Sequence, residues 1–258
     1  MVGEDGNDTK RVLFGYQVSA LTKKQIVDEV VKETPRNGVQ TLITMNVDHV
    51  VRLQDDARFR RAYRNAWIVT LDGMPVFLYS LIVSLGVPEL VTGSDLLADL
   101  AVALPVNRML FFVVSKPEVG ERLREYFTSR GFPSDSVKYV SPDFGFENDP
   151  VKTDQLIKAI RDHGATDLFF GIGAPKTEIW LDENRARLGN VFAFGFGSGL
   201  DFLVGVSHRA PVFMRRVALE WLWRLLSDPG RLWRRYLVHS WAIIPVIVAD
   251  ARGRLRRG

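Results

Sequence analysis

Asp72 is the acidic residue of the chain whose position best suits catalysis. It follows the apolar run Trp67–Leu71 and precedes Gly73. Such a run predicts a buried strand, and parallel α/β sheets bind ligands beyond the carboxyl ends of their strands. A carboxylate there has the position of a general base, which takes a proton from an attacking hydroxyl group. The competing interpretation is that Asp72 caps the helix that follows, a common role for aspartate.

Two glycine-rich segments also follow apolar runs and have the composition of phosphate-binding loops. They are Gly171–Lys176, with the sequence GIGAPK, and Gly195–Asp201, with the sequence GFGSGLD. Glycine lets backbone N–H groups approach a phosphate at the start of a helix. Neither segment has the G-x-G-x-x-G or Walker A spacing. A tight turn between strand and helix therefore explains these glycines as well as a phosphate site does.

The sequence offers no cluster of metal ligands. The chain has no cysteine, which excludes disulfides and thiolate metal sites, and its four histidines lack metal-ligand spacing. It also lacks an Asp-x-Asp pair, the usual carboxylate clamp for a divalent metal in nucleotide-sugar enzymes. We therefore expect no metal and no other cofactor. Basic side chains would then have to neutralise a departing diphosphate.

Basic side chains gather in the last fifty residues, Arg209–Gly258. This segment holds eleven arginines, three acidic residues and four of the six tryptophans; its net charge is +8, against +4 for the whole chain. Its apolar residues recur at helical spacing, as in Leu219, Trp223 and Leu226. Tryptophan on one face and arginine on the other is typical of a helix in a lipid headgroup layer. The alternative is a face packed on the protein, with the arginines as a solvated surface.

The C-terminal segment is not expected to cross a membrane. Its apolar stretch, Leu237–Ala249, is shorter than the roughly 20 residues that span a bilayer. The N-terminal sequence MVGEDGNDTK is polar and acidic, the reverse of a signal peptide. We therefore expect a cytoplasmic body whose C-terminal segment lies on a membrane or on protein.

Alternating strands and helices are predicted to position these residues. Short, continuously apolar runs predict buried strands at residues 40–44, 67–71, 109–114, 137–140, 168–172 and 191–196. Helical patterns cover residues 22–33, polar pieces up to about 65, and residues 94–104, 117–130, 151–161 and 178–187. Thr22 and Gln25 are expected to form a capping box, and Ser94 is expected to cap its helix.

These elements predict an α/β fold. We expect a Rossmann-like, mostly parallel sheet covered by helices on both faces, plus a C-terminal amphipathic helical appendage. The predicted division is a catalytic body at residues 1–208 and a basic appendage at residues 209–258 that completes the active site.

Several motifs occur together in a specific order and spacing. They are Thr44–Asn46, Trp67–Gly73, Val91–Asp95, Gly171–Glu178, Asp201–Gly205, Arg209–Pro211, Leu219–Leu225 and Arg231–Leu237. In this combination, from about Val18 to Tyr236, the chain resembles the WecG/TagA/CpsF glycosyltransferase family.

The resemblance implies a metal-independent, inverting transferase at the cytoplasmic face of the inner membrane. Members pass a sugar from a UDP donor to a polyprenyl-diphosphate-linked saccharide in the synthesis of bacterial cell-surface polysaccharides. The implied partners are these two substrates and anionic inner-leaflet lipid, which residues 209–258 would contact. No nucleic acid is expected. Because the apolar segment can self-associate without a membrane, a homo-oligomer is also expected.

The resemblance assigns roles to individual residues. Asp72 matches the family's proposed catalytic base. Arg224, Arg231 and Arg234 match arginines thought to close over the active site and stabilise the departing UDP. Further positions expected in the substrate site are Thr44, Asn46, Gly73, Thr92, Gly93, Asp95, Gly171, Gly173, Lys176, Thr177 and Glu178.

Donor recognition is the least determined part of this assignment. Asp201 falls where the family holds the uracil, and Phe146 falls where an aromatic ring stacks on it. Thr177 stands where the family commonly has glutamine, and Leu90 where it commonly has arginine. Both positions lie near the sugar or diphosphate in the family, so the donor sugar stays open between an N-acetylhexosamine and a hexose.

Two other functional classes remain as alternatives. One is a Rossmann-like enzyme that uses NAD or S-adenosylmethionine, although the dinucleotide fingerprint and its acidic partner residue are missing. The other is a non-enzymatic module whose basic segment binds nucleic acid or anionic lipid.

Overall fold

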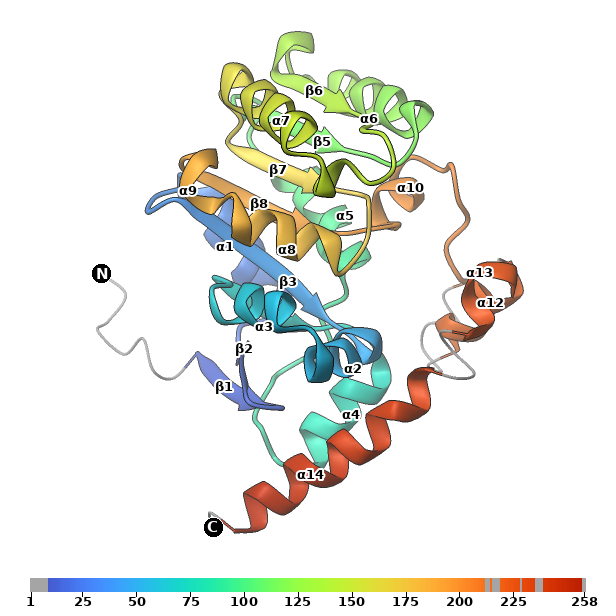
Figure 1. Cartoon of the computed structure of the whole chain (residues 1–258). Helices are drawn as coiled ribbons and strands as arrows, with labels where there is room; N and C mark the ends of the chain where they lie inside the picture. Colours follow the sequence, from blue (N-terminus) through green and yellow to red (C-terminus); the bar gives the residue numbers. More distant parts are fainter. Residues whose placement is uncertain (1–8, 212–213, 215–218, 228, 235–238, 257–258) are drawn as a thin grey trace.

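The computed structural model describes residues 9–211, 214, 219–227, 229–234 and 239–256. Its centre is a parallel sheet of six strands in the order β4-β3-β8-β7-β5-β6 (Figure 1). The strands are β3 (Val39–Met45), β4 (Ile68–Leu71), β5 (Leu110–Val113), β6 (Val137–Val140), β7 (Asp167–Phe170) and β8 (Val191–Gly195). All six predicted strands are therefore present, and the predicted α/β fold is confirmed.

Helices cover both faces of the sheet. On one face lie α1 (Lys23–Lys32), α5 (Gly93–Ala103), α6 (Pro117–Ser129) and α10 (Gly199–Leu203). On the other face lie α2 (Val47–Asp55), α3 (Ala57–Arg64), α7 (Pro150–His163), α8 (Lys176–Glu183) and α9 (Arg185–Leu188). Because successive strand residues point to opposite faces, both must be apolar, which explains the continuous apolar runs in the sequence.

Stacked phenylalanines join three neighbouring strands under the first of these faces. The ring centroids of Phe112 and Phe169 are 5.0 Å apart, and those of Phe169 and Phe194 are 4.9 Å apart. All three side chains are fully buried. Aromatic pairs of this kind contribute about 0.5–1.5 kcal/mol beyond the burial of their area. This stack joins β5, β7 and β8, and the loops after β7 and β8 contain candidate residues.

The helix caps follow the sequence in one case and differ from it in another. Thr22 and Gln25 form the predicted capping box at the start of α1. The prediction that Ser94 caps the next predicted helix is wrong, because α5 begins at Gly93 and Thr92 is its cap. The Thr92 hydroxyl accepts the N–H of Asp95 at 3.2 Å, which places Ser94 already inside the first turn.

Two elements beside β3 and β4 received no bounds in the sequence prediction. The first is an antiparallel hairpin of β1 (Lys10–Leu13) and β2 (Tyr16–Ser19). The second is α4 (Met74–Ile82), which begins directly after Asp72 and Gly73 and has no side-chain cap. Both pack into the apolar cluster beside β3 and β4.

The C-terminal segment contains α12 (Glu220–Ser227), α13 (Pro229–Trp233), the short 3₁₀ turn η4 (His239–Ala242) and α14 (Ile243–Leu255). Helix α12 confirms the helical spacing seen in the sequence. One face of α14, with Ile243, Val246 and Ile247, packs into the cluster beside β3 and β4. Among the described helices, none is both long and apolar enough to cross a membrane.

Candidate active site

The carboxylate of Asp72 lies at the carboxyl end of β4 and is half-buried. The Asp72 N–H donates to the carbonyl of Met45 at the end of β3, at 2.7 Å. Its side-chain Oδ2 accepts the N–H of Gly93, the first residue of α5, at 3.2 Å. The Asp72 carboxylate thus binds the start of α5, whose N-cap is Thr92. This contact fixes the carboxylate at the edge of the sheet, where a general base would have to lie.

Residues from the end of β3 complete this part of the site. A Cβ on Gly93 would lie 3.3 Å from the Thr44 hydroxyl oxygen and 3.3 Å from the Phe196 ring, so glycine allows α5 to approach the strand this closely. The Asn46 side chain caps α2 by accepting the N–H of His49 at 3.1 Å. The structure thus brings Thr44, Asn46 and the Asp72–Gly93 pair to one edge of the sheet.

Thr92 and Asp95 hold the start of α5 in place. The Thr92 hydroxyl donates to Asp95 Oδ2 at 2.8 Å. Arg209, at the start of the C-terminal segment, donates to Asp95 Oδ1 at 2.7 Å and to the Thr92 hydroxyl at 3.3 Å. These side chains were predicted to contact substrate, and in the structure they connect the helix that holds Asp72 to the C-terminal segment.

The loop between β7 and α8 has conformational reasons for its glycines. A Cβ on Gly171 would come within 2.9 Å of Leu200 in α10. Gly173 has φ +84°, a region that glycine adopts without strain. The hydroxyl of Thr177 donates to the Gly173 carbonyl at 3.1 Å and is buried. The tight-turn interpretation therefore accounts for both glycines, and a role in phosphate binding stays a prediction.

Glu178, on the first turn of α8, is a buried carboxyl group. Its Oε2 atom has no hydrogen-bond partner in the described part of the chain. Burial, reinforced by the charge of Asp48, raises the pKa of Glu178 to about 7. Burial and the charges of Glu178 and Asp72 raise the pKa of Tyr63 well above its ordinary value. The Tyr63 hydroxyl therefore stays protonated, 2.7 Å from Nδ1 of His49.

Burial decides how Thr177 and Glu178 can act. Their exposed fractions are 1% and 3%, so in this conformation neither side chain is accessible to a substrate. The prediction of direct substrate contact is therefore not supported for either residue. Thr177 instead holds the turn before Lys176 through its hydrogen bond to the Gly173 carbonyl.

Lys176 is the cation that the described residues place at the carboxyl end of β7. Its ammonium lies 3.5 Å from Oε1 of Glu147 and 4.7 Å from the ring centroid of Phe144. The Lys176 side chain is 30% exposed. A cation held this way is available to an anionic group at the edge of the sheet.

Phe146 is buried in this conformation, and its stacking on uracil stays a prediction. Its ring is 2% exposed and packs against Trp180, with ring centroids 6.1 Å apart. The exposed aromatic residue of the same loop is Phe144, with an exposed fraction of 96%. The turn at Gly145, with φ +83°, separates the two rings.

Asp201 lies in the first turn of α10, a short helix that packs on α5. It is half-buried, and its carbonyl accepts the N–H groups of Val206 and Ser207 at 3.0 and 3.3 Å. The structure thus places Asp201 beyond β8, on the same side of the sheet as α5. Its role in holding the uracil stays a prediction.

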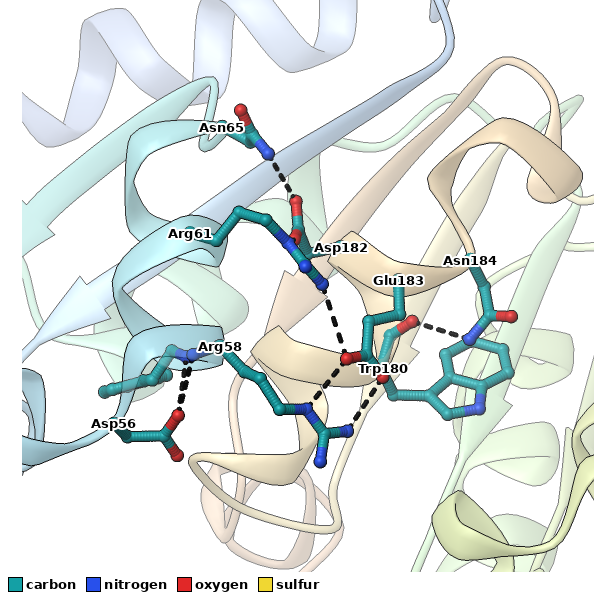
Figure 2. A network of polar contacts seen from close by, with 9 residues as sticks. Asp56, Arg58, Arg61, Asn65, Trp180, Asp182, Glu183 and Asn184 are labelled. Carbon is teal, nitrogen blue, oxygen red and sulfur yellow. Dashed lines mark hydrogen bonds and ion pairs between the residues drawn. The ribbon is translucent and has the colours of Figure 1, made fainter.

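A polar network attaches α8 to α3 (Figure 2). Arg58 makes two hydrogen bonds of 2.8 Å to the Glu183 carboxylate. Arg61 and Asn65 bind the Asp182 carboxylate at 2.6 and 2.7 Å. The network holds the carboxyl-terminal end of α8. The opposite end of this helix begins with Lys176.

The tail arginines are only partly described. The side chains of Arg224 and Arg231 lie outside the described residues, and the guanidinium of Arg234 lies 5.3 Å from the ring centroid of Trp233. Figure 1 shows α12 and α13 on the side of the molecule toward which β7 and β8 point. Closure of these arginines over the site stays a prediction.

Two further observations concern metal binding and the position of a groove relative to Asp72. Within the described residues, no group of three or more His, Asp or Glu side chains is arranged to hold a metal ion. A groove of about 930 Å³ lies between the β1–β2 hairpin and α1. Its lining includes Gln40 and Trp67, at the amino-terminal ends of β3 and β4, so it lies at the opposite end of the sheet from Asp72.

Comparison with known protein families assigns the chain to one family. The model of the glycosyl transferase WecG/TagA/CpsF family matches residues 11–257, nearly the whole chain. The match includes Asp72 and its partners as well as the arginine-rich segment. It supports the transferase expectation and neither of the two alternative classes. The chain therefore belongs to the WecG/TagA/CpsF family, whose members are glycosyltransferases of cell-surface polysaccharide synthesis.

Proposed function

We propose that this protein is a peripheral enzyme of the cytoplasmic membrane face. It transfers a sugar from a UDP donor to a polyprenyl-diphosphate-linked saccharide, with inversion at the anomeric carbon. The observation that carries the proposal is the Asp72 carboxylate, which the backbone N–H of Gly93 binds at the carboxyl edge of the sheet. Family membership supplies the reaction class.

In the proposed reaction, Asp72 removes the proton from an acceptor hydroxyl as its oxygen attacks the anomeric carbon. A new carbon–oxygen bond forms on one side while the bond to the UDP oxygen breaks on the other. The electron pair of the broken bond leaves on the diphosphate. The hydrogen bond from Gly93 to Oδ2 fixes the orientation of the base. Such positioning lets a general base contribute about 10²–10⁴-fold to the rate.

Basic side chains would stabilise the diphosphate leaving group in place of a metal. Lys176 supplies one cation at the end of β7. The C-terminal segment, with eleven arginines, supplies the rest, and we assign Arg224, Arg231 and Arg234 to this role. Cationic groups aimed at a developing negative charge are among the strongest sources of transition-state stabilisation.

Of the two positions that depart from the family pattern, Leu90 bears more directly on the donor. It precedes Val91, whose N–H donates to the carbonyl of Leu71 at 3.1 Å, one residue before Asp72. Thr177 is instead buried, with its hydroxyl bound to backbone. Position 90, where the family commonly has arginine, thus carries an apolar residue next to the segment that pairs with the end of β4, which favours a donor that does not require this charge.

The test is a transfer assay with the full chain in detergent. Polyprenyl-diphosphate-linked glucose and N-acetylglucosamine would be offered with a panel of UDP-sugars, with and without EDTA, and the lipid products weighed by mass spectrometry. The expected result is one product with one donor, unchanged by EDTA. No product with any donor would contradict the proposal, and loss of product in EDTA would contradict metal independence.

The variant Asp72→Asn tests the base within the same assay. It is expected to fold normally and to lose about 10²–10⁴-fold in turnover. The matched control is Asp162→Asn, which removes the same charge from an exposed position at the end of α7 and should keep full activity. Wild-type turnover of Asp72→Asn would show that another group takes the proton.

A further inference from the structure

Helix α4 exposes an apolar face although it belongs to the catalytic body. The sequence from Gly73 to Pro88 contains no charged residue. Val76 and Tyr79 of α4 are buried against the body. The exposed side is apolar as well, with exposed fractions of 49% for Leu78, 51% for Leu81 and 78% for Ile82. A helix that is apolar all round normally lies in a protein core or in lipid.

Helix α14 lies beside α4 and continues this character. The Tyr79 hydroxyl contacts Asp250 Oδ2 at 2.8 Å and the Ile247 carbonyl at 3.4 Å, which joins the two helices. The face of α14 turned away from the body exposes Ile244 (49%) and Val248 (40%). Figure 1 shows α14 running past α4 along one side of the molecule. We call the exposed side chains Leu78, Leu81, Ile82, Trp241, Ile244 and Val248 the α4–α14 surface.

The distribution of exposed apolar side chains sets this surface apart. Fifteen large apolar side chains are exposed in the described part of the chain; ten of them lie in α4 or in the C-terminal segment, and six of these ten make up the α4–α14 surface. The other five are scattered over the body, as is ordinary for a protein surface. Concentrated apolar exposure marks a binding surface.

The residues around the surface indicate which partner it fits. Trp241, 67% exposed, precedes the apolar face of α14, and Arg252 and Arg256 are exposed toward its end. Tryptophan prefers the boundary between headgroups and acyl chains, and arginine is attracted to anionic headgroups. Aliphatic side chains flanked by these two types are typical of helices that lie in a bilayer interface. The occupant that matches in both polarity and charge is a membrane with anionic lipid.

We propose that the α4–α14 surface rests on an anionic bilayer, so that α4 is a membrane contact contributed by the catalytic body itself. Asp72 lies two residues before the start of α4, a helix whose nine residues span about 13 Å. A bilayer that contacts Ile82 therefore lies close to the base. The orientation of α4 would then set the height of Asp72 above the membrane and so its distance from a lipid-linked acceptor. This last step rests on the proposed function.

Vesicle binding of the full chain tests the surface. The double variant Leu81→Glu/Ile82→Glu would be compared with Val102→Glu/Val151→Glu, which adds the same charge at two exposed positions of α5 and α7. The vesicles contain equal parts of phosphatidylglycerol and phosphatidylcholine. Binding is expected to weaken about tenfold or more in the first variant, because burial of two large aliphatic side chains is lost. The control should bind within about twofold of the wild type.

A depth measurement complements the binding assay. The chain has no cysteine, so a single Ile82→Cys substitution can be labelled with an environment-sensitive fluorophore. Its emission is expected to shift to the blue when vesicles are added. The same label at Val102→Cys is the control and should not shift. An unshifted label at position 82, or unchanged binding of Leu81→Glu/Ile82→Glu, would overturn the proposal.

The remaining outcomes separate this inference from the proposed function. If the wild type sediments as a dimer that Leu81→Glu/Ile82→Glu dissociates while vesicle binding is unchanged, the surface pairs two copies and the proposal is overturned. If no UDP-sugar is used in detergent but the label at position 82 still shifts, the proposed reaction fails and the membrane contact stands. If Leu81→Glu/Ile82→Glu transfers sugar to an acceptor in detergent but not to an acceptor embedded in vesicles, the membrane contact is supported.

Discussion

At the scale of single residues, Glu178 is a buried carboxyl group whose protonation is coupled to folding. Its pKa rises from 4.5 to about 7 in the folded protein, mainly because of burial. Between these values the folded state binds more protons than the unfolded state, so the free energy of unfolding falls as the pH rises from about 4.5 to about 7. Glu178→Gln is expected to remove this fall and to be more stable than the wild type near pH 8, by up to about 3 kcal/mol.

Urea unfolding at a series of pH values measures this effect. Glu118→Gln is a suitable control, because its side chain is 60% exposed on α6. It should follow the wild-type pH dependence. Parallel curves for Glu178→Gln and the wild type would show that Glu178 is hydrated or paired in solution.

Phe144 and Phe146 allow a second test at this scale. Phe144→Ala is expected to raise KM for the UDP donor roughly five- to a hundredfold, the range of one lost base–aromatic contact, with thermal stability unchanged. Phe146→Ala removes a buried ring and is expected to cost about 3–5 kcal/mol of stability instead. Donor titrations and thermal unfolding of both variants measure the contrast. An unchanged KM in Phe144→Ala would exclude the exposed ring from donor binding.

The sequence predicted candidate residues better than it predicted their partners. Asp72 was recognisable because an apolar run ending in Asp-Gly is a local pattern. Its contact with the N–H of Gly93 depends on α5, which starts 21 positions later and is brought there by the fold. Phe144 and Phe146 have nearly the same neighbours in sequence but opposite burial. Side-chain burial depends on packing between distant segments, which local composition does not contain.

At the scale of elements, a buried ion pair fastens the sheet at the end opposite the site. Arg108 donates to both oxygens of Asp167 at 2.8 and 3.0 Å and to the carbonyls of Val30 and Glu33 near the end of α1. Arg108→Met is expected to cost about 3–5 kcal/mol, because it leaves the fully buried Asp167 without its cation.

The exposed pairs between α3 and α8 provide the comparison. Arg58→Met removes two hydrogen bonds of 2.8 Å to Glu183, but the Arg58 side chain is 54% exposed. Such a pair contributes at most about 1 kcal/mol. Chemical denaturation of both variants checks the difference. Similar losses would mean that burial does not determine how much these contacts contribute to stability.

Elements with a clear period were predicted, and elements without one were missed. The strands were recognisable as continuous apolar runs, and α1 by its capping box. Helix α4 has neither a side-chain cap nor a polar face, because the cap position is Gly73 and both sides of the helix are apolar. The β1–β2 hairpin has four-residue strands, too short for a reliable alternation. The α4–α14 surface gives the missing polar face of α4 a physical reason.

At the scale of the whole molecule, the order of the strands in the sheet could not be predicted from the sequence. A parallel sheet with both faces covered followed from the apolar runs and the helices between them. The order β4-β3-β8-β7-β5-β6 requires β8 to insert between β3 and β7, far from β3 in sequence. No local pattern encodes that pairing. The same insertion brings the loops after β3, β4, β7 and β8 to one edge, where the candidate site lies.

The two ends of the described chain meet at α14, and this contact can be broken selectively. Asp250 accepts the N–H of Phe14 at 3.2 Å and the hydroxyl of Tyr79 at 2.8 Å. Burial and this hydrogen bond raise the pKa of Tyr79 to about 12, so the phenol remains a donor at neutral pH. Asp250→Ala removes the shared acceptor of both groups, and an unpaired buried polar group costs about 1–3 kcal/mol.

Hydrogen–deuterium exchange by mass spectrometry would locate that loss. In Asp250→Ala, amides of α14 and of the β1–β2 hairpin are expected to exchange faster, while β5 and β7 keep their protection, because the phenylalanine stack across the sheet is untouched. Asp162→Ala, at an exposed position, is the control. Faster exchange throughout the sheet would instead make α14 part of the global folding unit. The membrane-facing helix would then be inseparable from the catalytic body, and the division predicted at residue 208 would not describe how the molecule folds.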